Sequence, residues 1–200
     1  MITNIVFDLG NVLLEFNPCG YLKNYFSNSK MRRDMAQKIF GSEEWQKMDR
    51  GTIGRKELTE ILCQRYPGLS EEIKMIAASW DEMLTVKEET VEIAQKLKKD
   101  GHELYILSNM PQEAYFKIRG RYDFFELFTG EIISGLEGTI KPEAEIYQRL
   151  VDKYDLQAEN CLFIDDTAEN LTGARKMGFK TILFENIGQV KKELQSLKLL

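Results

Sequence analysis

Three apolar runs of the sequence each end in polar side chains that can carry out chemistry. Asp8 follows the first run, Ser108-Asn109 the second and Asp165-Asp166 the third. If these runs are strands of one parallel sheet, their carboxyl ends meet at a single edge, where such sheets bind ligands. Lys141 follows a predicted glycine-containing turn at residues 135–138 and precedes a predicted helix. The sequence therefore offers three carboxylates, a hydroxyl and one cation as candidate site groups.

This set of groups suits the transfer of a phosphoryl group. Carboxylate oxygens are preferred ligands of Mg²⁺, and phosphate oxygens can complete the metal's coordination. A lysine and a hydroxyl can hold the remaining phosphate oxygens and stabilise charge as the P–O bond breaks. Without a cation, Asp8, Asp165 and Asp166 repel one another, which raises their pKa values. The cluster therefore predicts a bound Mg²⁺.

Each of these residues also has a structural interpretation. Asp8 can cap a turn, and Asp165-Asp166 can serve as an N-cap pair for the next helix. Lys141 can be an ordinary solvated lysine, and Ser108 can be a turn residue. The order in which the groups follow successive predicted strands favours the functional interpretation.

The surrounding segments alternate between strand and helix patterns. Strands that alternate with helices predict a parallel sheet covered on both faces, so the expected fold class is α/β with a doubly wound parallel sheet. The predicted strands are 2–7, 104–107, 128–133, 161–164 and 181–184; helices are predicted at 88–99, from about 112, at 143–153, at 168–177 and at the C-terminus.

Residues between the first strand and position 86 have a different pattern, with amphipathic helical stretches and no convincing strand. Ser42 and Ser70 are predicted N-caps, and Pro67-Gly68 is a predicted break. Because this block interrupts the alternation, we interpret it as an insertion. We expect a core of residues 1–16 and 86–200 and a helical cap of residues 17–85. The predicted helices of the cap are 21–26, 31–40, 43–48, 56–66 and 71–84.

One run in the predicted cap, Asp49-Arg50-Gly51, breaks a helix and can reach toward the site. We predict that Arg50 contacts the substrate, with a solvated loop as the alternative. Trp45 and Trp80 are expected to pack between cap helices. The single histidine, His102, precedes a strand and has no evident partner, so we interpret it as structural or solvent-facing.

Four short motifs occur in order along nearly the whole chain: Phe7–Leu13, Ser108 after an apolar strand, Lys141-Pro142, and Phe163–Asp166 followed by Asn170 and Gly173-Ala174. Each motif alone is weak, but the ordered set resembles that of the haloacid dehalogenase-like (HAD) hydrolase superfamily. The helical block between the first two motifs resembles the helical cap of that superfamily.

The resemblance implies a Mg²⁺-dependent phosphatase of small phosphate monoesters that works through an aspartyl-phosphate. Asp8 would be the nucleophile and a metal ligand. The backbone carbonyl of Gly10 and the carboxylates of Asp165 and Asp166 would complete the Mg²⁺ site. The residues implied to hold the phosphoryl group are Ser108, Asn109 through its backbone, and Lys141.

Within the superfamily, the Asp-Leu-Gly-Asn-Val form of the first motif and the Lys-Pro-Glu-Ala-x-Ile-Tyr run resemble a sugar-phosphatase branch. This branch includes α-D-glucose-1-phosphate phosphatase and implies a sugar phosphate substrate. Most family phosphatases have a second Asp two residues after the nucleophile as general acid and base. Gly10 takes that position here, so the proton-transfer role is unassigned. A cap carboxylate, a bound water and the substrate's own hydroxyls are the alternatives.

Composition narrows the remaining function classes. The 200 residues carry a formal net charge of -5, and this lack of basic excess argues against nucleic-acid binding. No apolar run is long enough for a membrane span. The three cysteines are far apart and odd in number, which favours a reducing cytoplasm over a disulfide framework. The expected partner is a small-molecule phosphate ester, and both a monomer and a homodimer remain open.

Two rival functions fit the same residues. A 2-haloacid dehalogenase also uses an Asp nucleophile but needs no metal, so the Asp165-Asp166 pair argues against it. A non-catalytic or catalytically weak binding module on this fold is suggested by Gly10.

Overall fold

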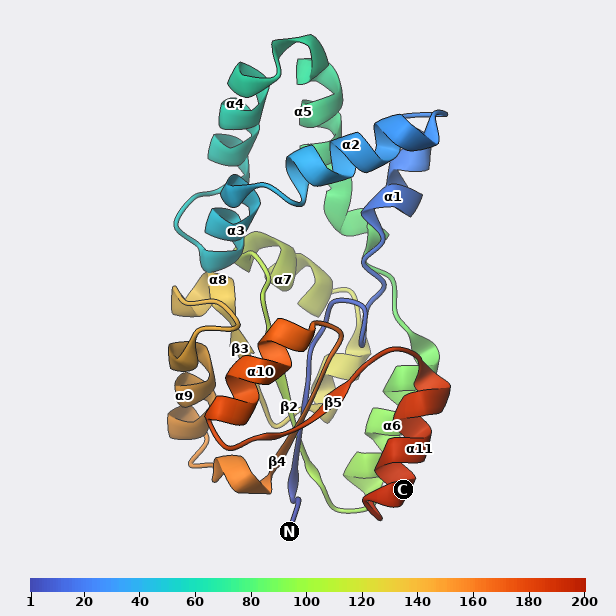
Figure 1. Ribbon diagram of the computed structural model, residues 1–200, viewed down its shortest axis with the longest axis vertical. Coiled ribbons are helices and arrows are strands. Elements are labelled where there is room, and N and C mark those ends of the chain that lie inside the picture. The colour runs from blue at the N-terminus through green and yellow to red at the C-terminus, as the bar shows by residue number, and fades with distance from the viewer.

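The computed structural model describes residues 1–200, and its centre is a five-stranded parallel sheet (Figure 1). The strand order is β3-β2-β1-β4-β5, and in the central strand Ile5 pairs with Leu104 on one side and Leu162 on the other. The strands are β1 Asn4–Phe7, β2 Glu103–Ser108, β3 Gly130–Ile133, β4 Cys161–Asp165 and β5 Lys180–Leu183.

Alternate side chains of β1 point to opposite faces of the sheet, and each face has its own apolar core. Ile5 and Phe7 belong to a large cluster, whereas Val6 belongs to a second, smaller one. A slip of one residue would exchange the two faces, so this burial fixes the register. The large cluster includes residues of α6 Glu88–Lys99, α7 Gln112–Arg119 and α11 Ile187–Ser196; the small one includes residues of α9 Ala144–Lys153 and α10 Ala168–Lys176. The predicted doubly wound α/β fold is confirmed.

Between β1 and α6 the chain is helical and contains no strand. Figure 1 shows these helices standing beyond the carboxyl ends of β1 and β2, on the far side of the molecule from both termini. We call residues 18–83 the helical segment. Its elements are α1 Pro18–Tyr21, η1 Leu22–Asn24, α2 Ser29–Ile39, α3 Glu43–Arg50, α4 Arg55–Arg65, η2 Pro67–Leu69, α5 Ser70–Ser79 and η3 Trp80–Met83.

The two chain segments that join the helical segment to the sheet lie side by side. The Glu15 amide donates to the Thr85 carbonyl at 2.7 Å, and the Lys87 amide donates to the Leu13 carbonyl at 2.9 Å. Between these bonds, Leu14 and Val86 form an antiparallel bridge. Paired connections restrict how the helical segment can move relative to the sheet.

Several local predictions can be compared with the structure. Ser42 caps α3 as predicted, because its hydroxyl accepts from the Trp45 amide at 3.1 Å. The predicted cap at Ser70 is wrong: Ser70 is the first residue of α5, and its hydroxyl donates to the carbonyls of Pro67 and Cys63. The predicted turn at 135–138 is also wrong. It is largely a short helix, α8 (Ser134–Glu137), with Gly138 in the left-handed conformation after it.

Two remaining short helices connect these elements and complete the fold: η4 Asp123–Leu127 and η5 Ala158–Asn160.

No helix of the structure has both the length and the apolar character required to cross a bilayer.

Candidate active site

The carboxyl ends of β1 and β4 bring two acidic residues side by side. Phe7 pairs with Ile164, and the Asp8 amide donates to the Ile164 carbonyl at 2.9 Å, so Asp8 lies next to Asp165. Asp166 follows at once, and one oxygen from each of the three carboxylates lies within 4.8 Å of the others. The strand register thus assembles three acidic groups that are far apart in sequence.

Lys141 is the cation that faces this cluster, and its side chain is almost fully buried. Its ammonium lies 2.9 Å from Asp8 Oδ1 and 2.6 Å from Asp165 Oδ2, and it donates to the Leu107 carbonyl at 3.0 Å. Burial alone would lower the pKa of Lys141, but Asp165 and Asp8 raise it above its ordinary value. Lys141 is therefore a fixed positive charge with all three N–H donors engaged.

Asn109 positions Lys141 through its backbone. The Asn109 amide group donates to the Lys141 carbonyl at 3.0 Å and accepts from the Lys141 amide at 2.8 Å. This pair of bonds ties the end of β2 to the Lys141 segment. Ser108, the last residue of β2, is buried and is not part of the cavity lining, whereas Asn109 is.

Asp165, the last residue of β4, and Asp166, which follows it, have different surroundings. Asp165 is fully buried; its oxygens accept from Lys141, from the Asn170 side chain at 3.0 and 3.1 Å, and from the Thr167 amide at 2.8 Å. Asp166 lines the cavity, where Asn11 donates to one of its oxygens at 2.8 Å. Asp165 is thus saturated by protein donors, and Asp166 is the more accessible of the two.

The two oxygens of the Asp8 carboxylate differ in their contacts with the protein. Its Oδ1 accepts from the Leu9 amide at 2.7 Å and contacts Lys141, whereas no protein group donates to its Oδ2. Burial raises the pKa of Asp8 to about 7, against the lowering effect of Lys141, and Asp165 adds to the rise. The protein alone therefore leaves negative charge at this edge insufficiently compensated.

A divalent cation fits this donor set. Three carboxylates against one lysine leave an excess of two negative charges, and hard oxygen donors of this kind suit Mg²⁺. The residues that can hold it are Asp8, Asp166, Asp165 and the backbone of Gly10, which lines the same cavity. A Cβ built at Gly10 would meet nothing within 4 Å, so steric crowding does not require glycine there.

A cavity of about 370 Å³ opens above the cluster. Its floor is polar, and its walls include Phe16, Trp45 and Trp80. The two indole rings are 4.7 Å apart in an edge-to-face arrangement, and both belong to the core of the molecule, so their predicted packing within the helical segment is confirmed. A second cavity of about 400 Å³ shares Trp80 and Pro111 with the first but contains none of the acidic cluster.

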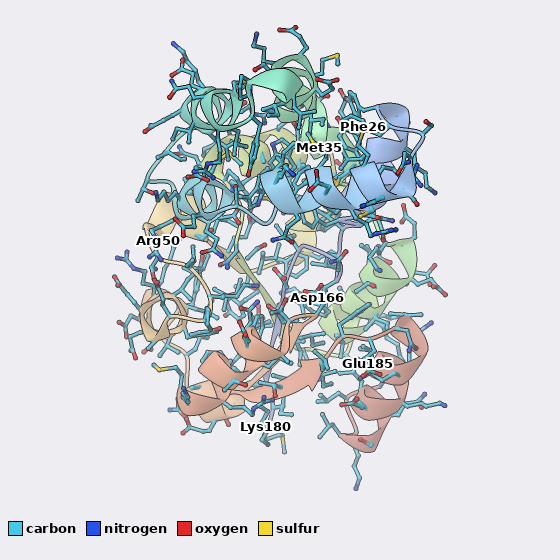
Figure 2. All side chains as sticks on the ribbon, turned by 45° about the horizontal axis from the view of Figure 1, so that its top comes forward. Phe26, Met35, Arg50, Asp166, Lys180 and Glu185 are labelled. Atoms are coloured by element: carbon cyan, nitrogen blue, oxygen red, sulfur yellow. The ribbon has the colours of Figure 1, made fainter.

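The helical segment contributes Asp49 to this cavity, not the predicted Arg50. Arg50 instead forms a bidentate ion pair with Glu143 at 2.6 and 2.8 Å, on the surface of the molecule. Figure 2 shows Arg50 at the edge of the molecule, well away from Asp166. Burial raises the pKa of Asp49 to about 8, and the nearby Asp8 adds to this effect. That Arg50 binds substrate remains a prediction that the geometry does not support.

A pattern in the sequence identifies Asp49 in retrospect. Trp45 and Asp49 are four residues apart on α3, so they share a helix face, and both line the cavity. The sequence alone assigns no role to Asn11 and Thr167, and Asn170 enters only as part of a motif; all three line the cavity and hydrogen-bond Asp165 or Asp166.

The amino-acid sequence matches the profile of the haloacid dehalogenase-like hydrolase family from residue 2 to residue 178. The chain belongs to this family. Among its relatives, a sesquiterpene phosphatase of Aspergillus oryzae is 27% identical over 173 residues, which are 86% of this chain and 85% of that protein. A drimenol cyclase of Aspergillus calidoustus is 23% identical over 200 residues; the match covers 98% of this chain but 37% of that longer protein.

A solved structure gives the same picture of the fold. A HAD family enzyme from Bacteroides thetaiotaomicron, in complex with magnesium and inorganic phosphate, superposes with a TM-score of 0.73 at 20% identity. The superposition covers 95% of this chain and 99% of that one. The whole molecule, helical segment included, therefore has the architecture of a HAD hydrolase.

The burial of Asp8 predicts a pH-dependent effect of Asp8→Asn on stability in EDTA. Because its pKa is raised in the folded protein, stability from the Asp8 proton is present at low pH and lost as pH rises through about 7. The Asn variant has no such loss. Relative to wild type, its melting temperature should therefore be higher at about pH 8.5 than at about pH 5.

Thermal unfolding at the two pH values measures this difference. Asp34→Asn, which removes an exposed carboxylate on α2, is the control and should show no comparable trend. A melting-temperature difference for Asp8→Asn that is the same at both pH values would contradict the prediction.

Proposed function

We propose that this HAD hydrolase is a Mg²⁺-dependent phosphatase of small phosphate monoesters that uses Asp8 as its nucleophile. The observation that carries this proposal is the open Oδ2 of Asp8, beside a fixed lysine and two further carboxylates, at the floor of a cavity. The similarity to a sesquiterpene phosphatase and to an enzyme solved with magnesium and phosphate supports the same chemistry.

In the proposed reaction, the Asp8 carboxylate attacks phosphorus, the P–O bond to the alcohol breaks, and an acyl phosphate forms. Water then attacks this phosphorus and releases inorganic phosphate, which restores the carboxylate. Bound Mg²⁺ supplies positive charge against the phosphate oxygens. Asp8, Asp166 and the Gly10 carbonyl would hold the metal, while Asp165 would hold it or orient its surroundings.

Lys141, Ser108 and Asn109 are proposed to position the phosphoryl group. Lys141 is the fixed cation next to the nucleophile, and Asn109 holds the Lys141 backbone in place. A preorganised charge of this kind stabilises the transition state without having to reorient during the reaction. Ser108 would act from the end of β2, where its neighbour Asn109 reaches the cavity.

We also propose that the chain divides into a catalytic core, residues 1–16 and 86–200, and a cap, residues 17–85, which selects the substrate. The aromatic walls of the cavity come mainly from the cap, and the reacting groups come from the core. We infer a cytoplasmic location, because all three cysteines are free thiols.

For the substrate, we propose a sugar phosphate, in keeping with the resemblance to the α-D-glucose-1-phosphate phosphatase branch. A cavity of about 370 Å³ accommodates a single sugar ring, and aromatic side chains can stack on its apolar face. The second candidate is the phosphate of an isoprenoid alcohol. It is favoured by the aromatic walls and by the similarity to a sesquiterpene phosphatase.

Asp8→Asn should abolish the hydrolysis of p-nitrophenyl phosphate, because an amide cannot act as the nucleophile. We expect a loss of roughly 10³-fold or more in kcat, as for other enzymes that lose a covalent nucleophile. Steady-state rates give the loss, and circular dichroism checks that the variant is folded. Retention of about a tenth of the wild-type rate would rule out Asp8 as the nucleophile.

Activity should require a divalent cation, and the two carboxylates of β4 should contribute unequally. Since Asp166 is the more accessible, Asp166→Asn should raise the Mg²⁺ concentration for half-maximal activity more than Asp165→Asn. We expect about tenfold for a residue that only supports the metal site, and more for a direct ligand. Mg²⁺ titrations of both variants measure this order. Full phosphatase activity in EDTA would contradict the Mg²⁺ dependence, and metal-free turnover of a 2-haloacid would favour the haloacid dehalogenase alternative.

The substrate class is tested by comparing kcat/KM for glucose 1-phosphate with that for geranyl phosphate. If the cap is shaped for a sugar ring, glucose 1-phosphate should be preferred by at least about tenfold, a ratio typical of discrimination by pocket shape. The opposite ranking would support the isoprenoid candidate. Trp80→Ala should change the ratio more than it changes the rate with p-nitrophenyl phosphate, because Trp80 lines the cavity but is not one of the proposed reacting groups.

A further inference from the structure

The proposed reaction requires a proton for the departing alcohol, and the core offers no free group to supply it. Three of the four titratable residues that line the cavity are already committed. Asp8 attacks phosphorus, Lys141 is held as a cation by two carboxylates, and Asp166 is a proposed metal ligand that accepts from Asn11. The fourth titratable residue in the lining is Asp49.

The Asp49 carboxylate has the free hydrogen-bonding capacity that a proton donor and acceptor needs. No hydrogen bond or ion pair within the protein involves this carboxylate; only the backbone carbonyl of Asp49 is bonded, to Ser134. The residue is partly exposed and lines the cavity. Its oxygens are therefore available to a ligand and not committed to holding the fold.

The position of Asp49 matches the expected path of the leaving group. Asp8 lies on the core side of the cavity, and Asp49 comes from α3 of the helical segment. In phosphoryl transfer, the attacking and leaving oxygens lie roughly in line on opposite sides of phosphorus. A nucleophile on the core side therefore directs the leaving oxygen toward the helical segment, which carries Asp49.

Three contacts fix the end of α3 on the core around Asp49. The Ser134 hydroxyl donates to the Asp49 carbonyl at 2.5 Å, and Arg50 binds Glu143 through two hydrogen bonds. Gly51, with φ +80°, packs so closely that a Cβ there would lie 2.6 Å from the Gly135 carbonyl. The backbone around Asp49 is thus fixed to the core, while the Asp49 carboxylate itself has no hydrogen-bond partner in the protein.

From this geometry we propose that Asp49 is the general acid and base of the reaction, an assignment that rests on the proposed phosphatase function. In the first step, the Asp49 carboxyl gives its proton to the bridging oxygen as the P–O bond breaks, so the alcohol leaves neutral. In the second step, the Asp49 carboxylate takes a proton from the attacking water. Phosphate is released, and Asp8 and Asp49 return to their starting forms.

The test compares two monoesters of similar size whose leaving groups differ in their need for a proton. p-Nitrophenol leaves readily as an anion, whereas benzyl alcohol does not. Asp49→Asn should reduce kcat/KM for benzyl phosphate by about 10²–10⁴-fold, the usual value of general acid catalysis, and for p-nitrophenyl phosphate by less than about tenfold. A merely structural defect would lower both values by the same factor.

Two matched variants sharpen this comparison. Glu43→Gln removes an exposed carboxylate from the opposite end of α3 and should leave both kcat/KM values unchanged.

Gly10 lines the same cavity, with free space around its Cα, so a carboxylate can be introduced there. In an Asp49→Asn background, Gly10→Asp should restore at least about tenfold of the lost benzyl phosphate activity, as expected for a transplanted acid.

The outcomes separate the two assignments. Suppose that wild type hydrolyses p-nitrophenyl phosphate in an Asp8-dependent way, and that Asp49→Asn lowers kcat/KM for both esters by the same factor or for neither ester. Then Asp49 is not the acid, and the phosphatase function stands. If wild type shows no Mg²⁺-dependent hydrolysis of either ester, then the phosphatase function fails and the role of Asp49 fails with it. A selective loss with benzyl phosphate supports both.

Discussion

The ion pairs that Lys141 makes with Asp8 and Asp165 are the interaction on which the rest of the site depends. All three side chains are almost fully removed from water, and charges in such surroundings are tolerated only when they are paired and hydrogen-bonded. One lysine cannot neutralise Asp8, Asp165 and Asp166 together. The fold therefore contains a cluster whose electrostatic balance is incomplete without a further cation. Burial raises the pKa of Asp8 to about 7, and the neighbouring Asp165 adds to this rise.

These carboxylates differ in how many hydrogen bonds they accept from the protein. Asp165 accepts from a lysine, an amide side chain and a backbone amide, so little capacity remains for a ligand. Asp8 has one oxygen, Oδ2, to which no protein group donates, and Asp166 lines the cavity while accepting from the side chains of Asn11 and Thr167. Neighbouring carboxylates thus differ in the hydrogen-bonding capacity they retain for a ligand, because the number of protein donors around each oxygen differs.

The sequence allowed the core of the site to be predicted, but not the part that depends on tertiary docking. Asp8, Asp165 and Lys141 follow apolar strands or a turn, and the period of those strands is readable in the chain. Asp49 lies on a helix that is docked by contacts with Ser134 and Glu143, which are 85 and 93 residues away in sequence from their partners Asp49 and Arg50. Its neighbour Arg50 was the more conspicuous candidate because a cation can bind a phosphate ester, yet its charge pairs with Glu143 and docks the helix.

Local errors have similar causes. Ser70 stands before a helical pattern, but the 3₁₀ turn at Pro67–Leu69 already begins the helix, so its hydroxyl bonds to preceding carbonyls and not to amides of the first turn. The glycines at 135 and 138 indicated a turn. A Cβ at Gly135 would lie 2.5 Å from the Gln112 amide nitrogen and 2.8 Å from the Met110 carbonyl oxygen, so a side chain would not fit there. Glycine is therefore required by this close packing, which is compatible with a short helix.

The segment from Ser134 to Glu143 links the proposed cap to the proposed catalytic lysine. At one end, Ser134 holds the Asp49 carbonyl and accepts from the Met110 amide at 2.8 Å; at the other, Glu143 holds Arg50. Lys141 lies between these contacts, with its backbone bonded to Asn109. One short segment therefore supports both the end of α3 and the cation that faces Asp8. For the proposed two-step reaction, such shared support would keep Asp8, its counter-charge Lys141 and the Asp49 carboxylate in a constant relative position.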